Sequence, residues 1–260
     1  MIKDKKHILK PKPISGFPEF LPEIRAVELQ WLDHIRATFE SFGFCNIETP
    51  AVEALDVIRA KGGDADKEIY VLERLHKDEE DNKEARLALH FDQTVPMARY
   101  VAQHFNELDF PFKRYQMQKV WRGERPQMGR MREFLQCDID VIHVDDLPIH
   151  FDAEIPAMIY EALNGLDIGR FQIRISNRKI LLGLLNALGI ENKVDVTRIV
   201  DKMDKLPLDE IELLLADECG LDAKQISAII NLVQTNDLNT IFPQNAEMED
   251  GLNELSFVMN

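Results

Sequence analysis

The sequence predicts an α+β fold, with a mixed, mainly antiparallel sheet flanked by helices and followed by a separate helical region. Two observations predict it. Strand-like runs are bunched early in the chain and interleaved with helical patterns, which is typical of an α+β domain. After Gly189 the pattern becomes helical throughout. We therefore expect a short flexible lead at residues 1–15, an α+β core at 16–190 and an acidic helical domain at 191–260.

The helices of the core are predicted from apolar residues at helical spacing and from their end signals. The first carries an apolar stripe that includes Trp31 and Phe39, which we expect to pack in the core. Thr94 is placed to cap the second, which has Pro96 in its first turn. Gly165 fits the end of the third. These helices are expected at residues 21–42, 94–104, 151–163 and 178–188.

The strands are predicted from strand-forming residues bounded by turn or loop signals. The first ends at Thr49-Pro50, and a charged, solvated loop over 76–85 joins the next two. A loop with Pro126 and Gly129 joins the next pair into a hairpin. The strands are expected at residues 46–53, 68–75, 86–91, 114–122, 133–141 and 171–176.

The predicted hairpin is unusually basic for this chain. Seven Lys or Arg residues lie between Lys113 and Arg132, opposed only by Glu124, in a chain with 31 basic and 46 acidic residues and a formal charge of −15. A basic cluster inside an acidic protein predicts an anion site, and the planar fork of Arg suits phosphate. No GxxxxGK[ST] or GxGxxG sequence occurs, which argues against P-loop and dinucleotide-binding folds.

The second strand of the hairpin has one apolar and one polar face. Alternation predicts that four residues point into the core, namely Leu135, Cys137, Ile139 and Val141. The opposite face carries Phe134, Gln136, Asp138 and Asp140. One interpretation is a strand with a solvent-facing side. The other is a pocket floor, in which an amide and two carboxylates receive a polar, cationic ligand.

The hairpin sequence WRGERPQMGRMREFLQCDID resembles the second signature motif of class II aminoacyl-tRNA synthetases, in the form found in histidyl-tRNA synthetases. The segments GFCNIETPAVE, LHFDQTVPMARY and IRISNRKILLGLL are similar to further segments of that family, so the resemblance covers about residues 16–205. The chain departs from the family pattern at His90 and Phe91, where Arg or a similar residue and Tyr or Pro are usual. The resemblance implies a class II synthetase-like fold followed by a helical insertion-like region.

The resemblance also implies the roles of individual residues. ATP would be bound by Arg122, Glu124, Arg130 and Phe134, with Arg122 as the catalytic residue at the α-phosphate. Histidine would be bound by Asp92, Thr94, Gln136 and Asp140. Pro50 would lie at the interface of a homodimer. Mg²⁺ would be held mainly by the ATP phosphates, with no metal site of the protein's own.

The implied activity is that of a histidine–tRNA ligase, which activates histidine with ATP and transfers it to tRNA(His). No Arg-Gly-Leu-Asp-Tyr-Tyr-type run, third class II motif or anticodon-binding domain is recognisable, so we expect an N-terminal part that is incomplete for catalysis. A second interpretation is a non-catalytic paralogue that binds histidine, like the regulatory subunit of ATP phosphoribosyltransferase. Such paralogues tend to lose the residues that here are Arg122 and Glu124. A third is an interaction protein that keeps the dimer surface around Pro50.

Composition sets further limits. The three cysteines form no CxxC pattern, which favours a reducing cytoplasm over a disulfide-bonded protein. No apolar run is long enough to span a membrane. Residues 191–260 carry 15 acidic and 5 basic residues, so this region is a poor RNA surface unless a local edge of Arg198, Lys202 and Lys205 makes the contact. The alternative is a solvated acidic appendage.

Overall fold

The computed structural model describes residues 10–60, 67–75, 86–235 and 237–260. The chain divides into two compact units, one made of Met1–Leu147 and Met158–Ile168 and the other of Pro148–Ala157 and Gly169–Asn260. The loop expected at 76–85 and most of the expected N-terminal lead lie outside the described residues.

The first unit contains two three-stranded sheets. In one, the long strands β5 (Phe112–Trp121) and β6 (Glu133–Ile142) pair antiparallel, and β1 (Cys45–Asn46) lies parallel to β5. The other is antiparallel in the order β2 (Val52–Ala54), β4 (Leu87–Leu89) and β3 (Val71–Leu72). The mainly antiparallel sheet is confirmed, whereas the strand expected at 46–53 is divided in two and the one expected at 68–75 is reduced to two residues.

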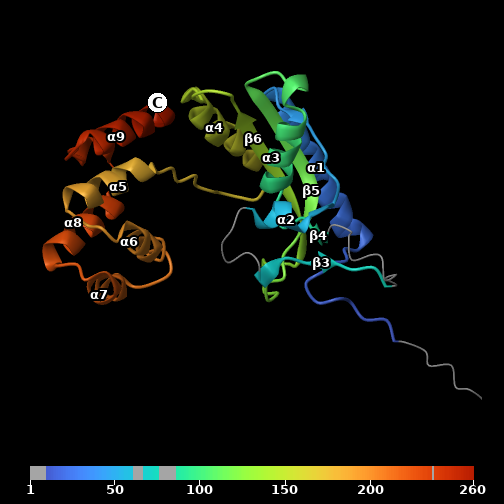
Figure 1. Ribbon diagram of the computed structural model, residues 1–260, viewed down its shortest axis with the longest axis horizontal. Coiled ribbons are helices and arrows are strands. Elements are labelled where there is room, and N and C mark those ends of the chain that lie inside the picture. Colours follow the sequence, from blue (N-terminus) through green and yellow to red (C-terminus); the bar gives the residue numbers. More distant parts are fainter. Residues whose placement is uncertain (1–9, 61–66, 76–85, 236) are drawn as a thin grey trace, which may run out of the picture. The chain divides into compact units, whose positions relative to one another are not determined.

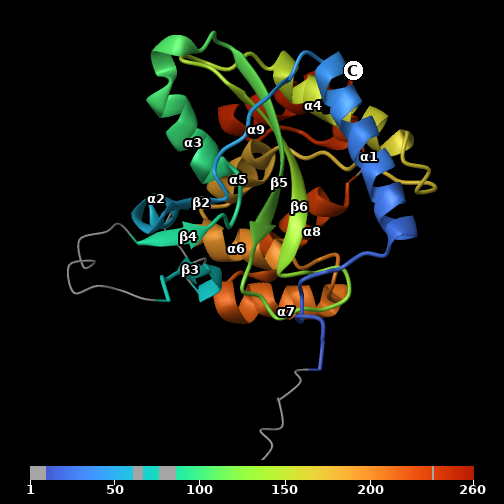
Figure 2. The same ribbon diagram turned by 90° about the vertical axis from the view of Figure 1, so that its right-hand side faces the viewer.

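Helices α1 (Pro22–Ser41) and α3 (Thr94–Gln103) lie on opposite sides of the β5–β6 hairpin (Figure 2). On one side the ring of Phe39 lies 5.7 Å from that of Tyr115. On the other, α3 packs on β5 through a cluster of Ile47, Met97, Val101 and Phe112. Because side chains alternate along β5, the sheet can present different chemistry to each helix.

The apolar stripe of α1 is only partly covered by this chain. The helix is confirmed, but its buried residues are Thr38 and Phe39 near its C-terminal end. Trp31 remains 42% exposed and Ile24 58% exposed. The expectation that the whole stripe packs in the core is therefore wrong for the described residues, since only the last turns of α1 are buried against the sheet.

The start of α3 differs from the sequence expectation. Thr94 is exposed and already helical, so it does not cap the helix. Instead an Oδ1 atom of Asp92 accepts a hydrogen bond from the backbone N–H of Val95 at 3.2 Å. A carboxylate at this end of a helix also interacts favourably with the helix dipole. The capping role thus belongs to a buried acid two residues earlier in the chain.

Gln93 ties the start of α3 to the hairpin. Its side chain is fully buried, and its Nε2 atom donates to the backbone carbonyls of Gln118 and Gln136, both at 3.0 Å. Those two residues lie opposite each other in the β5–β6 register. One amide therefore fixes the segment around Asp92 against both strands.

The apolar face predicted for β6 is half-buried and not part of a core. All ten residues of β6 have intermediate exposure, and the strand is at the edge of its sheet. Burial, and then the neighbouring Asp138 carboxylate, raise the pKa of the Cys137 thiol to about 11. Cys137 is therefore a protonated packing residue at neutral pH, as its position on the apolar face suggested.

The second unit is a helical assembly with its own core. Its helices are α5 (Arg178–Ala187), α6 (Lys193–Val200), α7 (Leu208–Cys219), α8 (Ala223–Gln234) and α9 (Ala246–Met259). Their buried aliphatic residues form one cluster, which includes Leu185, Ile199, Ile211 and Ile229. The expected stop at Gly220 is confirmed, because Gly220 ends α7 with a φ of 67°. Asp222 and Gln225 then form a capping box at the start of α8.

Helix α5 packs along α9 and belongs to the second compact unit (Figure 1). The sequence placed α5 in the core that ends at residue 190. The preceding segment 171–176 was expected to be a strand, and this is wrong: it has no regular secondary structure. A strand needs a partner for its backbone hydrogen bonds, and no strand among the described residues pairs with it. The third expected helix is confirmed as α4 (His150–Asn164).

The proposed basic edge of the helical unit is partly neutralised. Arg198 on α6 forms ion pairs with Asp195 at 3.1 Å and Glu218 at 3.3 Å. Its charge is therefore offset before any RNA approaches, which leaves Lys202 and Lys205 in the turn that follows α6. Separately, none of the helices in the described ranges is long and apolar enough to cross a membrane.

Gly251 allows α9 to approach α5 closely, and we predict that alanine there destabilises the helical unit. A Cβ atom on Gly251 would lie 2.8 Å from Cβ of Lys179 and 2.9 Å from the backbone nitrogen of Ile180. Overpacking of this kind typically costs about 1–3 kcal/mol, which outweighs the helix propensity of about 1 kcal/mol that alanine adds. Urea unfolding of Gly251→Ala should show a lower free energy of unfolding. Asn253→Ala, an exposed position on the same helix, should show no loss.

We also predict that Gln93→Ala loosens the first unit. The substitution removes two buried hydrogen bonds that join α3 to the hairpin, at a cost of about 1–3 kcal/mol. Urea unfolding followed by tryptophan fluorescence would measure the loss. Gln127→Ala in the exposed hairpin loop is the control and should lie within about 0.5 kcal/mol of the unsubstituted chain. An equal effect of the two substitutions would contradict the role of Gln93.

Candidate active site

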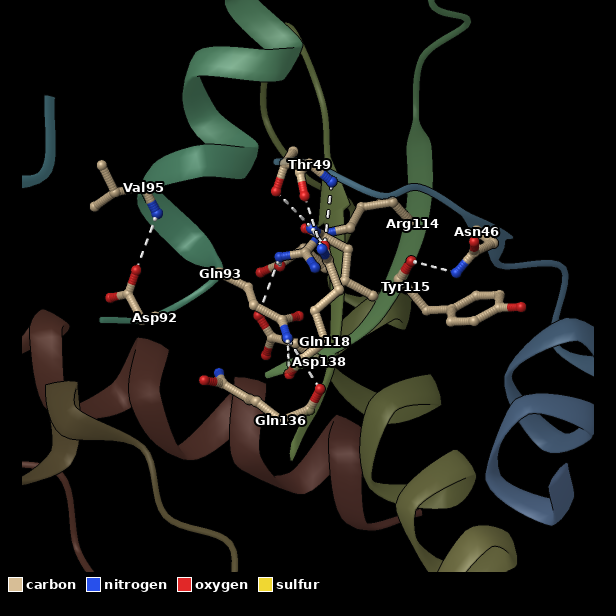
Figure 3. A network of polar contacts seen from close by, with 12 residues as sticks. Asn46, Thr49, Asp92, Gln93, Val95, Arg114, Tyr115, Gln118, Gln136 and Asp138 are labelled. Carbon is tan, nitrogen blue, oxygen red and sulfur yellow. Dashed lines mark hydrogen bonds and ion pairs between the residues drawn. The ribbon is translucent and has the colours of Figure 1, made fainter. Parts of the chain in front are cut away.

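The site is built on the face of the hairpin that α3 approaches. Because β5 and β6 are paired antiparallel, Arg114 lies opposite Asp140, Gln116 opposite Asp138, and Gln118 opposite Gln136. Figure 3 shows Arg114, Gln118, Gln136 and Asp138 gathered on this face, while Tyr115 points the other way, toward α1. The polar face predicted for β6 is thus matched by a polar face on β5.

Arg114 is the centre of this polar face. Its side chain is fully buried, and its Nη2 atom lies 3.1 Å from Oδ2 of Asp138 and bonds Oδ2 of Asp140 as well. Burial raises the pKa of Asp140 above its ordinary value. The Arg114 cation acts in the opposite direction, whereas the Asp138 and Asp92 carboxylates raise that pKa further. A single cation therefore supports two half-buried carboxylates.

The next pair along the hairpin is held by the segment before Pro50. Gln118 donates through Nε2 to the carbonyl of Thr49 at 2.7 Å, and its Oε1 accepts from the Thr49 backbone N–H at 3.1 Å. Gln116 donates to the Thr49 hydroxyl at 3.1 Å. This network fixes both glutamine side chains against the sheet. Pro50 itself is exposed and takes no part in it.

Arg122 extends from the end of β5 between two aromatic rings. Its guanidinium carbon lies 4.9 Å from the ring centroid of Phe91 and 5.1 Å from that of Phe134. Its Nε atom donates to the Phe91 carbonyl at 3.2 Å. Guanidinium groups stack well on aromatic faces, so this arrangement orients the side chain while leaving its two terminal nitrogens for other partners.

The hairpin loop places Glu124 beside Arg130. Nη1 of Arg130 lies 3.0 Å from Oε2 of Glu124, and the Arg130 side chain is 61% exposed. Arg132 donates through Nε to the carbonyl of Glu124 at 3.1 Å, and its backbone N–H donates to the carbonyl of Gly16 at 2.7 Å. The end of the N-terminal segment is thereby attached to the loop.

Several buried polar atoms of this face have no hydrogen-bond partner among the described residues. They are Oε1 of Gln136, Oε1 of Gln116, Nε and Nη1 of Arg114, and Oε1 of Gln93, which bonds this face. Both ring nitrogens of His90, which follows β4, have no such partner either. Buried polar atoms are costly unless they are satisfied by protein, water or ligand. Water or a polar ligand could satisfy these atoms, which is consistent with the pocket-floor interpretation of β6.

The predicted residues fall into two groups, with Thr94 and Pro50, both exposed, outside them. Arg122, Phe134, Gln136 and Asp140 project from the same side of the hairpin by strand parity, and Gln93 ties the adjacent Asp92 to that side. Glu124 and Arg130 pair with each other in the loop. Sequence reasoning missed Arg114, Gln93 and Thr49, although the parity of Arg114 with Gln116 and Gln118 could have identified it.

The environment of His90 is a further feature that the sequence marked only as a departure. Its ring is fully buried, and burial lowers its pKa below the ordinary value. The nearby Arg99 cation lowers that pKa too, while Glu53 and Asp92 raise it. Glu53 is itself engaged by Arg99 at 2.5 Å. His90 is thus a neutral, buried neighbour of Asp92.

Comparison with known proteins identifies what this arrangement is similar to. A family model described as histidyl-tRNA synthetase matches residues 16–258. The histidine–tRNA ligase of Thermobifida fusca is 55% identical over 235 residues, which cover 90% of this chain and 53% of that protein. That of Micrococcus luteus is 44% identical over 266 residues, covering 95% and 57%. The chain spans about half the length of the curated relatives it matches.

Solved structures agree with the fold. The crystal structure of histidyl-tRNA synthetase from Nostoc sp. PCC 7120 has a TM-score of 0.86 and 39% identity, covering 97% of this chain and 57% of that one. An ATP phosphoribosyltransferase regulatory subunit/histidyl-tRNA synthetase from Bacillus halodurans C has a TM-score of 0.75 at 20% identity, covering 96% and 65%, which shows the fold alone. The expected α+β, class II synthetase-like fold is confirmed. With a family model over residues 16–258 and a relative at 55% identity, the chain belongs to the histidyl-tRNA synthetase family.

Proposed function

We propose that this chain carries the part of a histidine–tRNA ligase that binds ATP and histidine and brings them together for adenylation. The observation that carries the proposal is the position of Arg122. Its guanidinium is held between Phe91 and Phe134, at the end of a strand pair whose floor carries Gln136 and Asp140. A phosphate-binding cation thus adjoins a floor of acceptors for N–H groups. Family membership supports the assignment.

The reaction needs positive charge more than it needs a side-chain nucleophile. The carboxylate of histidine attacks the α-phosphorus of ATP, and pyrophosphate leaves. Both reactants are anions, so a fixed cation is needed to bring them together and to stabilise the charge on the phosphoryl oxygens. Arg122 is suited to this task because its orientation is already fixed by the aromatic rings and by the Phe91 carbonyl. Its terminal nitrogens can then donate to the α-phosphate.

The amino acid would bind over the floor formed by β6 and the segment before α3. Gln136 offers an Oε1 acceptor with no partner among the described residues, which fits an N–H of the histidine ammonium. Asp92 is buried and precedes Gln93, whose amide bonds the Gln136 carbonyl, and it supplies negative charge, with Thr94 as its neighbour. Asp140 would accept an imidazole N–H. Buried acceptors of this kind discriminate strongly against side chains that leave them unpaired.

The nucleotide would bind over the hairpin loop. Glu124 would accept from the adenine amino group, and Arg130 would move toward the phosphates. Their mutual ion pair is largely exposed on the Arg130 side, and such pairs contribute only about 0–1 kcal/mol. Replacing the Glu124–Arg130 ion pair by contacts with ATP therefore costs little free energy.

Mg²⁺ would enter with ATP and reduce the charge of its phosphates. Among residues 10–60, 67–75, 86–235 and 237–260 no group of three or more His, Cys, Asp or Glu side chains is placed to hold a metal ion. We therefore assign no side chain to the ion, which commonly keeps several waters and phosphate ligands.

The larger context of the reaction is also a proposal. The names of the relatives support transfer of histidine to tRNA(His). The free cysteines support a reducing, cytoplasmic location. A homodimer is supported by four exposed apolar residues on α1, namely Ile24, Val27, Leu29 and Trp31. The exposed Pro50 would lie at the same interface. C2 symmetry, with the same patch on both subunits, is the commonest solution for such a surface.

A regulatory paralogue that binds histidine without charging tRNA is the second candidate. The structural similarity to the Bacillus halodurans protein shows that the fold alone does not separate the two. The presence of Arg122, Glu124 and Arg130 favours the enzyme, since a histidine sensor needs none of them.

The test is histidine-dependent ATP–pyrophosphate exchange, with calorimetric titration of ATP and histidine. We predict that Arg122→Gln weakens ATP binding about 10-fold, because one charged donor is lost, and lowers exchange about 100- to 1000-fold. Arg170→Gln is the matched control, since Arg170 is exposed and lies outside the hairpin. Histidine binding without exchange would indicate either a truncated synthetase or the regulatory paralogue. If neither ATP nor histidine binds, the proposal is contradicted and the interpretation as an interaction protein is favoured.

A further inference from the structure

Arg114 has no role in the site as assigned above, yet it is the most completely buried charged residue of the hairpin. Its side chain has 0% exposure, while its partners Asp138 and Asp140 retain 25% and 33%. The cation is therefore beneath the floor, and the carboxylates face the space above it. A ligand on the floor would meet Asp140 and not Arg114.

We propose that Arg114 is a positioning residue that fixes the carboxylate of Asp140 as an ionised acceptor for the imidazole N–H of histidine. The proposal rests on the function proposed above and extends it to the choice of amino acid. Arg114 would act through Asp140 without touching the substrate. Its effect should therefore fall on histidine and not on ATP.

The geometry of the ion pairs supports a positioning role. An Arg that serves one carboxylate usually donates two parallel hydrogen bonds from its fork. Here a single nitrogen, Nη2, bridges Asp138 and Asp140, while Nε and Nη1 have no partner among the described residues. Arg114 thus ties two neighbouring acids together at the expense of its own hydrogen bonds. Because Arg114 and Asp140 are directly opposite in the register, the strand pairing itself holds them in place.

The charge balance explains why an N–H donor would be preferred. One cation and two carboxylates leave a net negative charge on the floor, and Asp92 adds another nearby. Such a surface favours a ligand that donates N–H groups and rejects one that presents an oxygen. Histidine can donate from its ammonium and from its ring.

Removal of the cation would change the protonation of Asp140. The charged groups that act on it are Arg114 from β5, Asp138 from β6 and Asp92 from the segment before α3. Without Arg114 all of these neighbours are acidic, and burial already raises the pKa of Asp140. Asp140 would then take up a proton at higher pH, and a protonated acid is a poorer acceptor.

The first arm of the test measures ligand binding by calorimetry at pH 7. Arg114→Met keeps most of the side-chain volume and removes the charge, and it should weaken histidine binding about 10-fold or more while changing ATP binding less than about 2-fold. Arg114→Lys should restore part of the affinity, because it keeps the charge without the fork. Lys119→Met is the matched control. Lys119 is also a β5 cation paired with a β6 acid, Glu133, but on the opposite face, so histidine binding should not change.

The second arm tests whether Arg114 acts through Asp140. If Arg114 affects histidine only through Asp140, its substitution should have little effect once Asp140 has been replaced, because the two effects are then not additive. Adding Arg114→Met to Asp140→Asn should therefore alter histidine affinity less than about 2-fold. In the ligand-free chain, ¹³C NMR titration of the Asp140 carboxyl should show its pKa moving upward in Arg114→Met. If Arg114→Met does not fold, histidine affinity and the pKa of Asp140 are measured in Arg114→Lys instead.

The outcomes separate this proposal from the function on which it rests. Histidine binding that is equal in the unsubstituted, Met and Lys chains would overturn the role of Arg114 and leave the function standing. A parallel loss of histidine and ATP affinity would also overturn it, because it would show a merely structural role. No histidine binding by the unsubstituted chain would overturn the proposed function, and with it this proposal, which rests on that function.

Discussion

A single buried cation organises the hairpin on which the candidate site depends. Arg114 neutralises carboxylates on the neighbouring strand, and its pairing with Asp140 coincides with the β5–β6 register. A slip of one residue would move both acids to the face of Tyr115 and leave Arg114 buried without a counter-charge. Breaking a buried ion pair in this way typically costs about 3–5 kcal/mol. The Arg114–Asp140 ion pair therefore shapes the floor and also stabilises the observed register of β5 and β6.

The sequence could predict local structure and short motifs. The hairpin followed from alternation and from Pro126 and Gly129, and a linear motif pointed to Arg122 and Gln136. What it could not predict were contacts that depend on how distant segments meet. Gln93 bonds two carbonyls that are 25 and 43 positions away, and neither carbonyl leaves a mark in the sequence.

The other differences between the predicted and the observed structure also arise from contacts between distant segments. Periodicity shows that α1 has an apolar face, but it does not show what covers that face, and Ile24 remains exposed in this chain. Strand-like residues at 171–176 do not make a strand, because a strand exists only with a partner. The change in composition near Gly189 marked where the acidic sequence begins. The compact unit begins earlier, since α5 buries its apolar face against α9 and the rest of that helical core.

The short segment between β4 and α3 connects the two halves of the site. Phe91 contacts Arg122 through its ring and its carbonyl, Asp92 caps α3, and Gln93 bonds the strand pair beneath Gln136. A displacement of this segment would therefore move the phosphate-binding cation and the amino acid floor together. Under the proposed function, such coupling would give a physical reason for ATP and histidine to favour each other's binding, because each would stabilise the same arrangement of three consecutive residues. Buried, neutral His90 precedes them, and its own backbone carbonyl accepts from Trp121 at 2.7 Å. The segment is thus held to the hairpin at both of its ends, which limits how far Arg122 and the floor of β6 can move relative to each other.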